Sequence, residues 1–184
     1  MNNKRPSPIV RAQSVRNRTQ LGKRTSKPAR KAAIYFAFGR EARGQVTQTQ
    51  EQQRGQWLGP GGETHSHEAA LIWAQEAAKN HEYTFQALLS VPQGRLTPQD
   101  YGEALERAGI LRDWRLMVHN DTAYSHAHVL FFRDKRIEKE QYLRWQADVR
   151  QALALREQQR LSEPEAVQNL SEELTIAMPE VELA

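Results

Sequence analysis

The sequence predicts an α+β fold: a mainly antiparallel sheet with helices packed on one face and a histidine-bearing hairpin at its centre. Segments with strand-like alternation and segments with helical apolar spacing follow one another in the order β-α-loop-α-β-α-β-β-α. Only a turn-like stretch separates the last two strand segments, as is typical of antiparallel neighbours. The sequence contains no Gly-rich phosphate loop and no internal repeat, which leaves one α+β domain with tails.

A basic arm, residues 1–27, opens the chain and is expected to contain a short edge strand over residues 8–15. Residues 1–40 carry eleven Lys or Arg and no acid. Such an arm typically contacts a polyanion, although a merely solvated tail is the ordinary alternative. The folded domain is expected over residues 28–160. An acidic tail, residues 161–184, has six Glu and no base and is expected to be disordered.

The first helix is expected over residues 27–40. Pro28 suits a first helical position and Gly39 suits a stop. Tyr35 lies near the C-terminal end, where a side chain can leave the core and enter a cleft. A tyrosine in such a helix is more often a packed aromatic residue than a nucleophile, so this segment alone does not decide its role.

Residues 43–63 are rich in Gln, Gly and Thr and predict a loop. In it Trp57 could be exposed and stack on a nucleic-acid strand, or the segment could be an ordinary surface loop. The remaining elements follow from apolar periodicity and helix caps. They are a helix over 65–81, a strand over 82–91, a helix over 97–108 and a helix over 138–160.

The hairpin is expected to lie between apolar, strand-forming flanks at residues 114–118 and 129–132, with a turn over residues 120–125. With the turn centred there, His119 lies opposite His126, and His128 shares their face because side chains alternate along a strand. Three imidazoles on one patch predict a divalent metal site with an open position. Asp121 could orient one ring through a hydrogen bond. A single histidine in a strand is usually structural, but three on one face are harder to explain that way.

A second His-x-His, His65 and His67, sits at a loop-to-helix junction, where alternation does not align the two rings. We therefore interpret it mainly as a coincidence. The chain has no cysteine, which excludes thiolate zinc sites, disulfides and cysteine nucleophiles and fits a reducing, cytoplasmic compartment. No apolar run is long enough for membrane insertion, and no signal peptide is expected.

The hairpin resembles the third motif of relaxases, the mobilisation nucleases of plasmid conjugation, which belong to the HUH endonucleases. Residues 119–129 read His-Asn-Asp-Thr-Ala-Tyr-Ser-His-Ala-His-Val and match the family pattern at its first His, its Asp and its His-x-His. Residues 83–92 and the helix after them are similar to the segment before this motif in the P-type branch. Residues 33–40 resemble that branch's first motif, which holds a nucleophilic Tyr. The resemblance covers roughly residues 28–150.

The resemblance implies a relaxase-like nuclease domain that nicks a transfer origin through a 5′-phosphotyrosine. Tyr35 would be the nucleophile, and His119, His126 and His128 would bind Mg²⁺ or Mn²⁺. Asp121 would assist deprotonation of the phenol. The implied partners are single-stranded origin DNA, accessory relaxosome proteins and a coupling protein. Basic residues would hold the DNA backbone, namely Arg11, Lys23, Arg24, Arg30, Lys31 and Arg40.

Two other functions remain open from the sequence. The chain could be a non-catalytic DNA-binding accessory protein built on a relaxase scaffold. It could also be a zinc hydrolase with three His ligands and a metal-bound water, although Asp121 is then its only convincing general base. The first alternative predicts salt-sensitive DNA binding that does not depend on Tyr35 or the histidines. The second predicts cleavage with no protein–DNA link.

Overall fold

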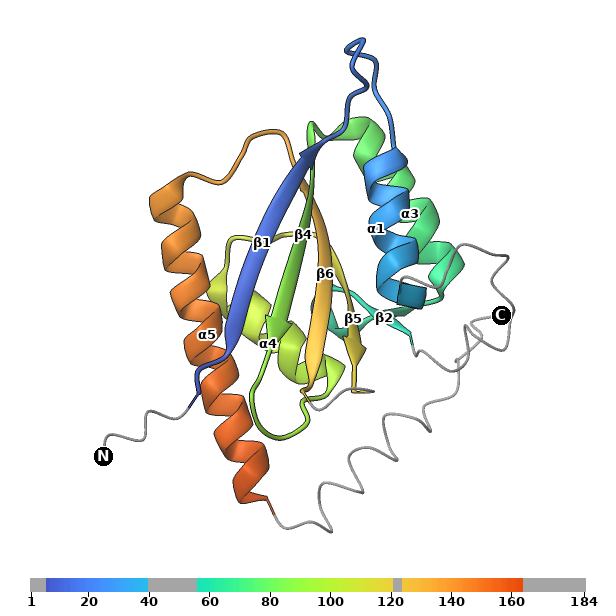
Figure 1. Cartoon of the computed structure of the whole chain (residues 1–184). Coiled ribbons are helices and arrows are strands. Elements are labelled where there is room, and N and C mark those ends of the chain that lie inside the picture. Colours follow the sequence, from blue (N-terminus) through green and yellow to red (C-terminus); the bar gives the residue numbers. More distant parts are fainter. Residues whose placement is uncertain (1–5, 40–55, 121–123, 164–184) are drawn as a thin grey trace.

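A six-stranded antiparallel sheet and four α-helices make up the framework of the protein in a computed structural model (Figure 1). The structure describes residues 6–39, 56–120 and 124–163. The strand order is β1-β4-β6-β5-β2-β3, so the chain enters the sheet at one edge and β6 lies near its centre. The strands are β1 Ile9–Arg16, β2 Trp57–Leu58, β3 Thr64–His65, β4 Tyr83–Ser90, β5 Trp114–His119 and β6 His126–Arg133. The α+β class and the antiparallel sheet are therefore confirmed.

The helices begin and end where local sequence signals place them. Helix α1 has Pro28 in its first turn, and Ser66 caps α3 by accepting a hydrogen bond from the Ala69 amide. Thr97 and Asp100 form a reciprocal capping box at the start of α4. The helices are α1 Lys27–Phe38, α3 His67–Asn80, α4 Pro98–Ala108 and α5 Lys139–Ser162, with a short 3₁₀ turn, η2, at Pro60–Gly62. Within the described residues, no helix is long and apolar enough to cross a membrane.

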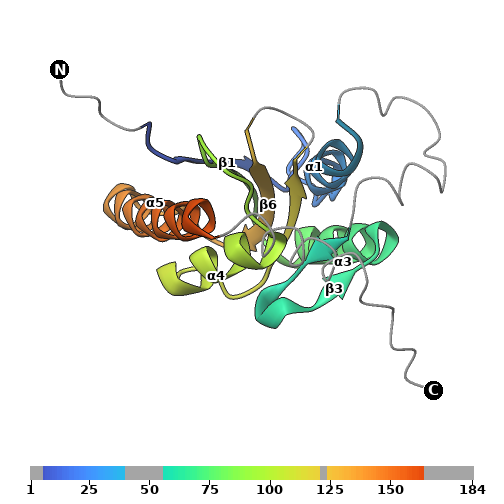
Figure 2. The ribbon, with the colours of Figure 1, turned by 90° about the horizontal axis from the view of Figure 1, so that it is seen from below.

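Helices cover both faces of the sheet, which corrects the expectation that they pack on one face. Helices α4 and α5 cover one side, and α1 lies on the other (Figure 2). The first core lies between the sheet and helices α4 and α5 and contains Phe131 and Trp145. Met117 and Leu130 belong to a second core, beneath α1 and α3. The physical reason lies in β6, where residues 129–131 are all buried. A strand buried on consecutive positions needs an apolar partner on each face.

Trp57 is completely buried, so the expectation of an exposed Trp57 for stacking on nucleic acid is wrong. Two residues of β2 pair with β3 and extend the sheet beyond β5, where Leu58 pairs with Leu116. The indole thus fills the core beneath α1 rather than a loop surface. The rest of the predicted loop, residues 40–55, and most of the acidic tail, residues 164–184, lie outside the described residues.

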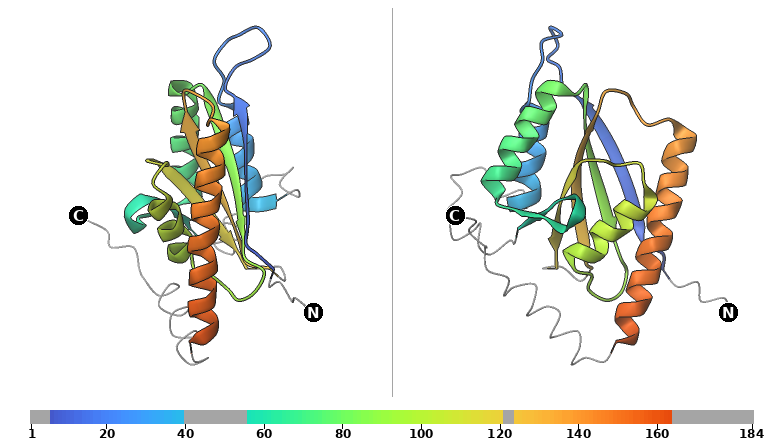
Figure 3. Two further views of the ribbon diagram at one scale, coloured as in Figure 1. Left: turned by 90° about the vertical axis from the view of Figure 1, so that its left-hand side faces the viewer. Right: turned by 180° about the vertical axis from the view of Figure 1, so that it is seen from behind.

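An arm hairpin, residues 17–26, projects from the end of the sheet between β1 and α1 (Figure 3). Its turn is closed by a hydrogen bond from the Gly22 amide to the Thr19 carbonyl, and Gly22 adopts a positive φ of 78° that favours glycine. Its base is held by Asn17, which is fully buried and accepts a hydrogen bond of 2.6 Å from the Thr84 hydroxyl. The arm is thus a folded part of the protein in this region.

Glu82 ties the arm hairpin to the sheet through ion pairs with Arg16, Arg18 and Arg24. Hydrogen bonds from Arg18 and Arg16 lower the pKa of the Glu82 carboxyl from its ordinary 4.5 to about 2. A carboxyl whose pKa is lower in the folded protein stabilises the fold above its ordinary pKa. That contribution is lost as pH falls from about 4.5 towards 2.

We therefore expect Glu82→Gln to lower the melting temperature at pH 7, by an amount that shrinks on acidification below pH 4.5. The measurement is thermal unfolding of both proteins between pH 7 and pH 2. Glu76→Gln, at an exposed position on α3, is the matched control and should follow the wild type. A difference that stays constant down to pH 2 would show that the carboxylate charge is not its source.

Candidate functional site

Three histidines meet at one end of the paired strands β5 and β6. The register pairs His119 with His126 and Met117 with His128, so all three rings project from the same face of the sheet. The ring centroids of His119 and His126 are 5.1 Å apart, and each lies 5.4 Å from the ring of His128. All three are partly buried. We call these residues the histidine cluster.

The donor chemistry of the histidine cluster fits a divalent metal ion, but its side chains are not already arranged around one. Imidazole nitrogens bind divalent transition metals at about 2.0–2.1 Å. Among the described residues, no three His, Asp or Glu side chains are already arranged to hold a metal ion. Metal binding would therefore require the side chains of the cluster to rearrange. Asp121, the predicted orienting residue, lies outside the described residues.

The protonation of the cluster favours ligation. Nδ1 of His126 lies 3.2 Å from the Tyr124 carbonyl oxygen. Because a carbonyl only accepts, this contact places the proton on Nδ1 and leaves Nε2 with a lone pair. Burial, followed by the neighbouring His119 and His126, lowers the pKa of His128 to about 3. His128 is thus neutral at physiological pH, which is the state that binds metals.

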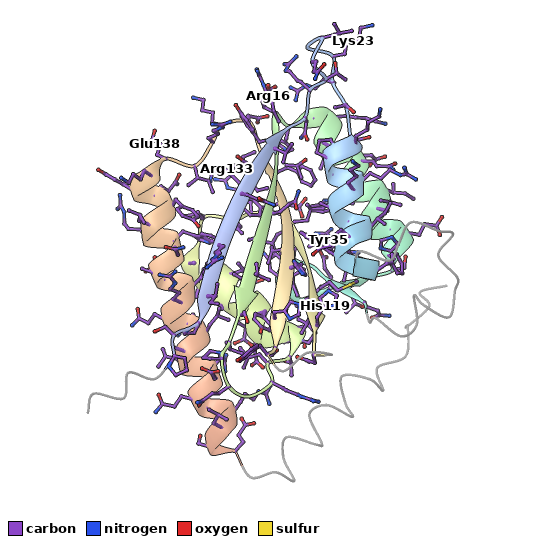
Figure 4. All side chains as sticks on the ribbon, in the orientation of Figure 1. Arg16, Lys23, Tyr35, His119, Arg133 and Glu138 are labelled. Atoms are coloured by element: carbon purple, nitrogen blue, oxygen red, sulfur yellow. The ribbon has the colours of Figure 1, made fainter. Side chains whose placement is uncertain are left out.

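Helix α1 brings two aromatic side chains against His128. The Tyr35 ring lies 5.9 Å from the His128 ring in an edge-on arrangement, and 44% of Tyr35 is exposed. Phe36 stacks on the same imidazole at 4.5 Å with an interplanar angle of 18°. Tyr35 therefore points towards the histidine cluster and solvent rather than into the core (Figure 4). Phe36 fixes one face of His128, a role that its place in the apolar stripe of the helix did not reveal.

The sheet surface beside the cluster is open. Strand β1 presents Ile9, which is 43% exposed, together with the exposed Arg11 and Gln13, on the face that carries the histidines. Arg11 pairs with Leu88 of β4, and Leu88 pairs with His128 of β6. At about 4.8 Å between strands, the Arg11 backbone is about 10 Å from that of His128.

The other predicted DNA-contacting residues lie in different parts of the protein. Lys31 lies one helical turn before Tyr35, on the same face of α1 and on the side of the cluster. Lys23 lies on the arm hairpin, at the end of the sheet remote from His119 (Figure 4). Arg24 is engaged with the His81 carbonyl and Glu82. Arg30 is exposed on α1, and Arg40 lies outside the described residues.

The second His-x-His does not join the cluster. His65 faces Glu63, with 3.5 Å between Nε2 and Oε1. Nδ1 of His67 accepts a 3.3 Å hydrogen bond from the indole of Trp57. Trp57 in turn lies 6.4 Å from Phe36 by ring centroids, so His67 belongs to the aromatic packing beneath α1. Its contacts are those of a structural residue.

Ser125 anchors the strand that carries two of the histidines. Its side chain is buried directly before His126, and its hydroxyl accepts hydrogen bonds from the Tyr101 hydroxyl at 3.1 Å and the Leu96 amide at 3.3 Å. Its carbonyl accepts from the Val91 amide. Burial raises the pKa of Tyr101, which keeps that phenol protonated as a donor. A polar residue at the start of an apolar strand was the sequence signal for this anchor.

Replacing Ser125 by Ala should leave the Tyr101 hydroxyl and the Leu96 amide buried without a partner. We expect a loss of about 1–3 kcal/mol in the free energy of unfolding. Urea unfolding measures it, with Ser7→Ala, at an exposed position, as the control. Adding Tyr101→Phe should recover part of the loss because one orphaned donor is removed. An unchanged unfolding midpoint for Ser125→Ala would contradict the anchoring role.

Comparisons of this chain with protein-family models, with curated proteins and with solved structures give no match. The case for a function therefore depends on the residues themselves. They place a tyrosine, three histidines and an open sheet face side by side.

Proposed function

We propose that this chain is a relaxase of the HUH endonuclease group, a metal-dependent enzyme that nicks single-stranded DNA at a transfer origin. One observation carries the proposal: the half-exposed Tyr35 ring lies 5.9 Å from His128 within a cluster of three imidazoles. Tyr35 and the histidines come from elements far apart in the sequence and meet on one face of the sheet. A nucleophile beside a set of metal ligands is the arrangement that metal-assisted transesterification of a phosphodiester needs.

The proposed reaction is an in-line exchange of one phosphoester bond for another. The phenolic oxygen of Tyr35 forms a bond to phosphorus, and the bond from phosphorus to the 3′ oxygen breaks. The phenolic proton is removed and the released 3′ hydroxyl gains one, so the products are a 5′-phosphotyrosine and a free 3′-OH. Because the energy of the phosphoester is conserved in the link, the reverse reaction can reseal the strand.

The metal site of this proposal consists of His119, His126 and His128. A divalent ion there would stabilise the charge that develops on the non-bridging phosphate oxygens. The Nδ1 contact of His126 with the Tyr124 carbonyl oxygen keeps Nε2 available as a donor. Phe36 restricts the ring of His128 by stacking on it. Imidazole ligands suit Mn²⁺ better than Mg²⁺, which prefers oxygen ligands.

The open face of β1 and β4 offers a path for the DNA strand next to the cluster. Arg11 lies in the row of residues that contains His128, and Lys31 lies on the same face of α1 as Tyr35. A phosphate between β1 and α1 would have a cation on each side. Such contacts position the backbone without reading its sequence, so they support binding of a single strand rather than recognition of a particular site.

A random-sequence pool of single-stranded DNA tests the proposal without knowledge of the nick site. The full-length protein is incubated with the pool and Mn²⁺ and then denatured, and the DNA that remains covalently attached is amplified and sequenced. We expect an enriched motif with its 5′ end on the protein. Recovery of no covalent adduct would overturn the nicking function, and adducts without a common motif would overturn its restriction to a transfer origin.

A non-catalytic DNA-binding protein is the second candidate, and the arm hairpin favours it. Leu21 at the turn is 86% exposed. Lys23, two residues further on, lies far from the histidine cluster (Figure 4). This candidate predicts salt-sensitive DNA binding that is unchanged by His126→Ala or Tyr35→Phe and needs no metal. Binding of this kind, together with a pool selection that yields no adduct, would establish it over the first candidate.

A further inference from the structure

A cavity lies at the end of the sheet opposite the histidine cluster. Its volume is about 540 Å³, within the range of small-molecule sites. The end of α3, the segment between α4 and β5, the end of β6 and the start of α5 surround it. Its apolar wall includes Ile110, Leu111, Phe131 and Phe132. Of these, the partly buried Phe132 ring offers the flat apolar surface that suits a ring.

Arg133 brings to this cavity a positive charge that forms no ion pair with any residue the structure describes. Its Nη1 atom is buried and has no hydrogen-bond partner among the described residues. A buried guanidinium nitrogen without a partner is costly, and natural proteins rarely leave one unsatisfied. The same residue lines the cavity, and because Nη1 has almost no accessible surface, the Arg133 side chain must turn before a ligand there can supply the missing acceptor.

The acid in the cavity wall does not supply that acceptor. Oδ1 of Asp113 accepts a 2.8 Å hydrogen bond from Arg115, and Oδ2 accepts a 2.8 Å hydrogen bond from the Trp73 indole. Arg112 lines the wall as a second arginine. With Asp113 neutralised by Arg115, the two arginines leave the cavity selective for anions.

We infer that this cavity is a binding site for a small aromatic phosphate, of about the size of a mononucleotide, with its phosphate on Arg133 and its ring against Phe132 and Ile110. Guanidinium groups bind phosphate through paired hydrogen bonds, and the apolar wall covers the ring. The site is distinct from the histidine cluster and does not depend on the proposed nicking function.

Isothermal titration calorimetry of the full-length protein with adenosine 5′-monophosphate, in the absence of metal, tests the inference. We expect saturable binding, with adenosine and inorganic phosphate each binding at least about tenfold more weakly, because each lacks one half of the ligand. Arg133→Gln should weaken the binding of the monophosphate by about ten- to a hundredfold. Arg150→Gln, at an exposed position on α5, is the matched control and should bind as the wild type does.

Ala77→Phe provides a second variant that keeps Arg133 and fills the cavity from α3. It should also abolish binding, so a folding defect in Arg133→Gln does not leave the inference undecided. The inference is overturned if the monophosphate does not bind at millimolar concentration, or if it binds equally well to the wild type and to Ala77→Phe. His126→Ala should bind the monophosphate normally, so failure of this site and failure of the nicking function remain distinguishable.

Discussion

Tyr35→Phe should abolish the covalent protein–DNA adduct and leave DNA binding intact. The phenylalanine ring can keep the edge-on contact with His128, because that contact involves the ring and not the hydroxyl. The substitution removes only the oxygen that would bond to phosphorus. Loss of a catalytic nucleophile typically costs several orders of magnitude, so we expect a decrease of at least about a thousandfold in the rate of adduct formation.

The measurement uses a labelled single strand that carries the motif recovered from the random pool. Adducts are resolved by denaturing electrophoresis, and DNA binding is measured separately by fluorescence anisotropy. Tyr124→Phe is the matched control, because Tyr124 is a second exposed tyrosine close to His126 in the sequence. If Tyr124→Phe loses the adduct and Tyr35→Phe keeps it, the nucleophile has been assigned to the wrong tyrosine. If both keep it, neither is the nucleophile.

The sequence predicted the elements of the fold well because their signals are local. Pro28, Thr97 and Ser66 mark helix starts, and in the structure each lies within one residue of such a start, while Asp100 completes the capping box of α4. Alternate residues of β4 point to the face of the sheet that packs into the first core, namely Tyr83, Phe85, Ala87 and Leu89. Signals of this kind depend on a few neighbouring residues, so they can be read without tertiary information.

The arrangement of helices on the sheet could not be derived in the same way. An apolar stripe shows that a helix packs, but not on which face of the sheet. The buried run Val129, Leu130 and Phe131 was the available signal for cover on both faces. Trp57 was misassigned because its strand has only two residues and is stabilised by pairing with β3 and with the distant β5.

Only part of the candidate site follows from the sequence. That His126 and His128 share a face follows from strand periodicity, and in the structure their ring centroids are 5.4 Å apart. The approach of α1 to His128, through Tyr35 and Phe36, is a tertiary contact between segments about ninety positions apart, and no periodicity predicts it. The sequence pointed to Tyr35 as a nucleophile only through the resemblance to relaxases. The structure adds that its ring lies beside His128.

His126→Ala should abolish metal binding, because it removes one of the three imidazole donors on the face of the sheet that Tyr35 approaches from α1. Loss of groups that merely orient a ligand already costs about ten- to a hundredfold in metal affinity, so loss of a ligand itself should cost at least about a hundredfold. Electron paramagnetic resonance of Mn²⁺ measures this without any DNA, since bound and free ions differ in signal. Adduct formation should fall with metal occupancy, while binding of the single strand should persist.

His65→Ala is the matched control, because it removes a histidine from the second His-x-His that lies outside the cluster. It should bind Mn²⁺ as the wild type does and form adducts at the wild-type rate. If His65→Ala and His126→Ala lose metal equally, the ion is held elsewhere and the histidine cluster is structural. If neither variant changes Mn²⁺ binding but His126→Ala still abolishes the adduct, His126 acts on the phosphate or on Tyr35 directly. The two variants thus separate a metal site from an imidazole that works without one.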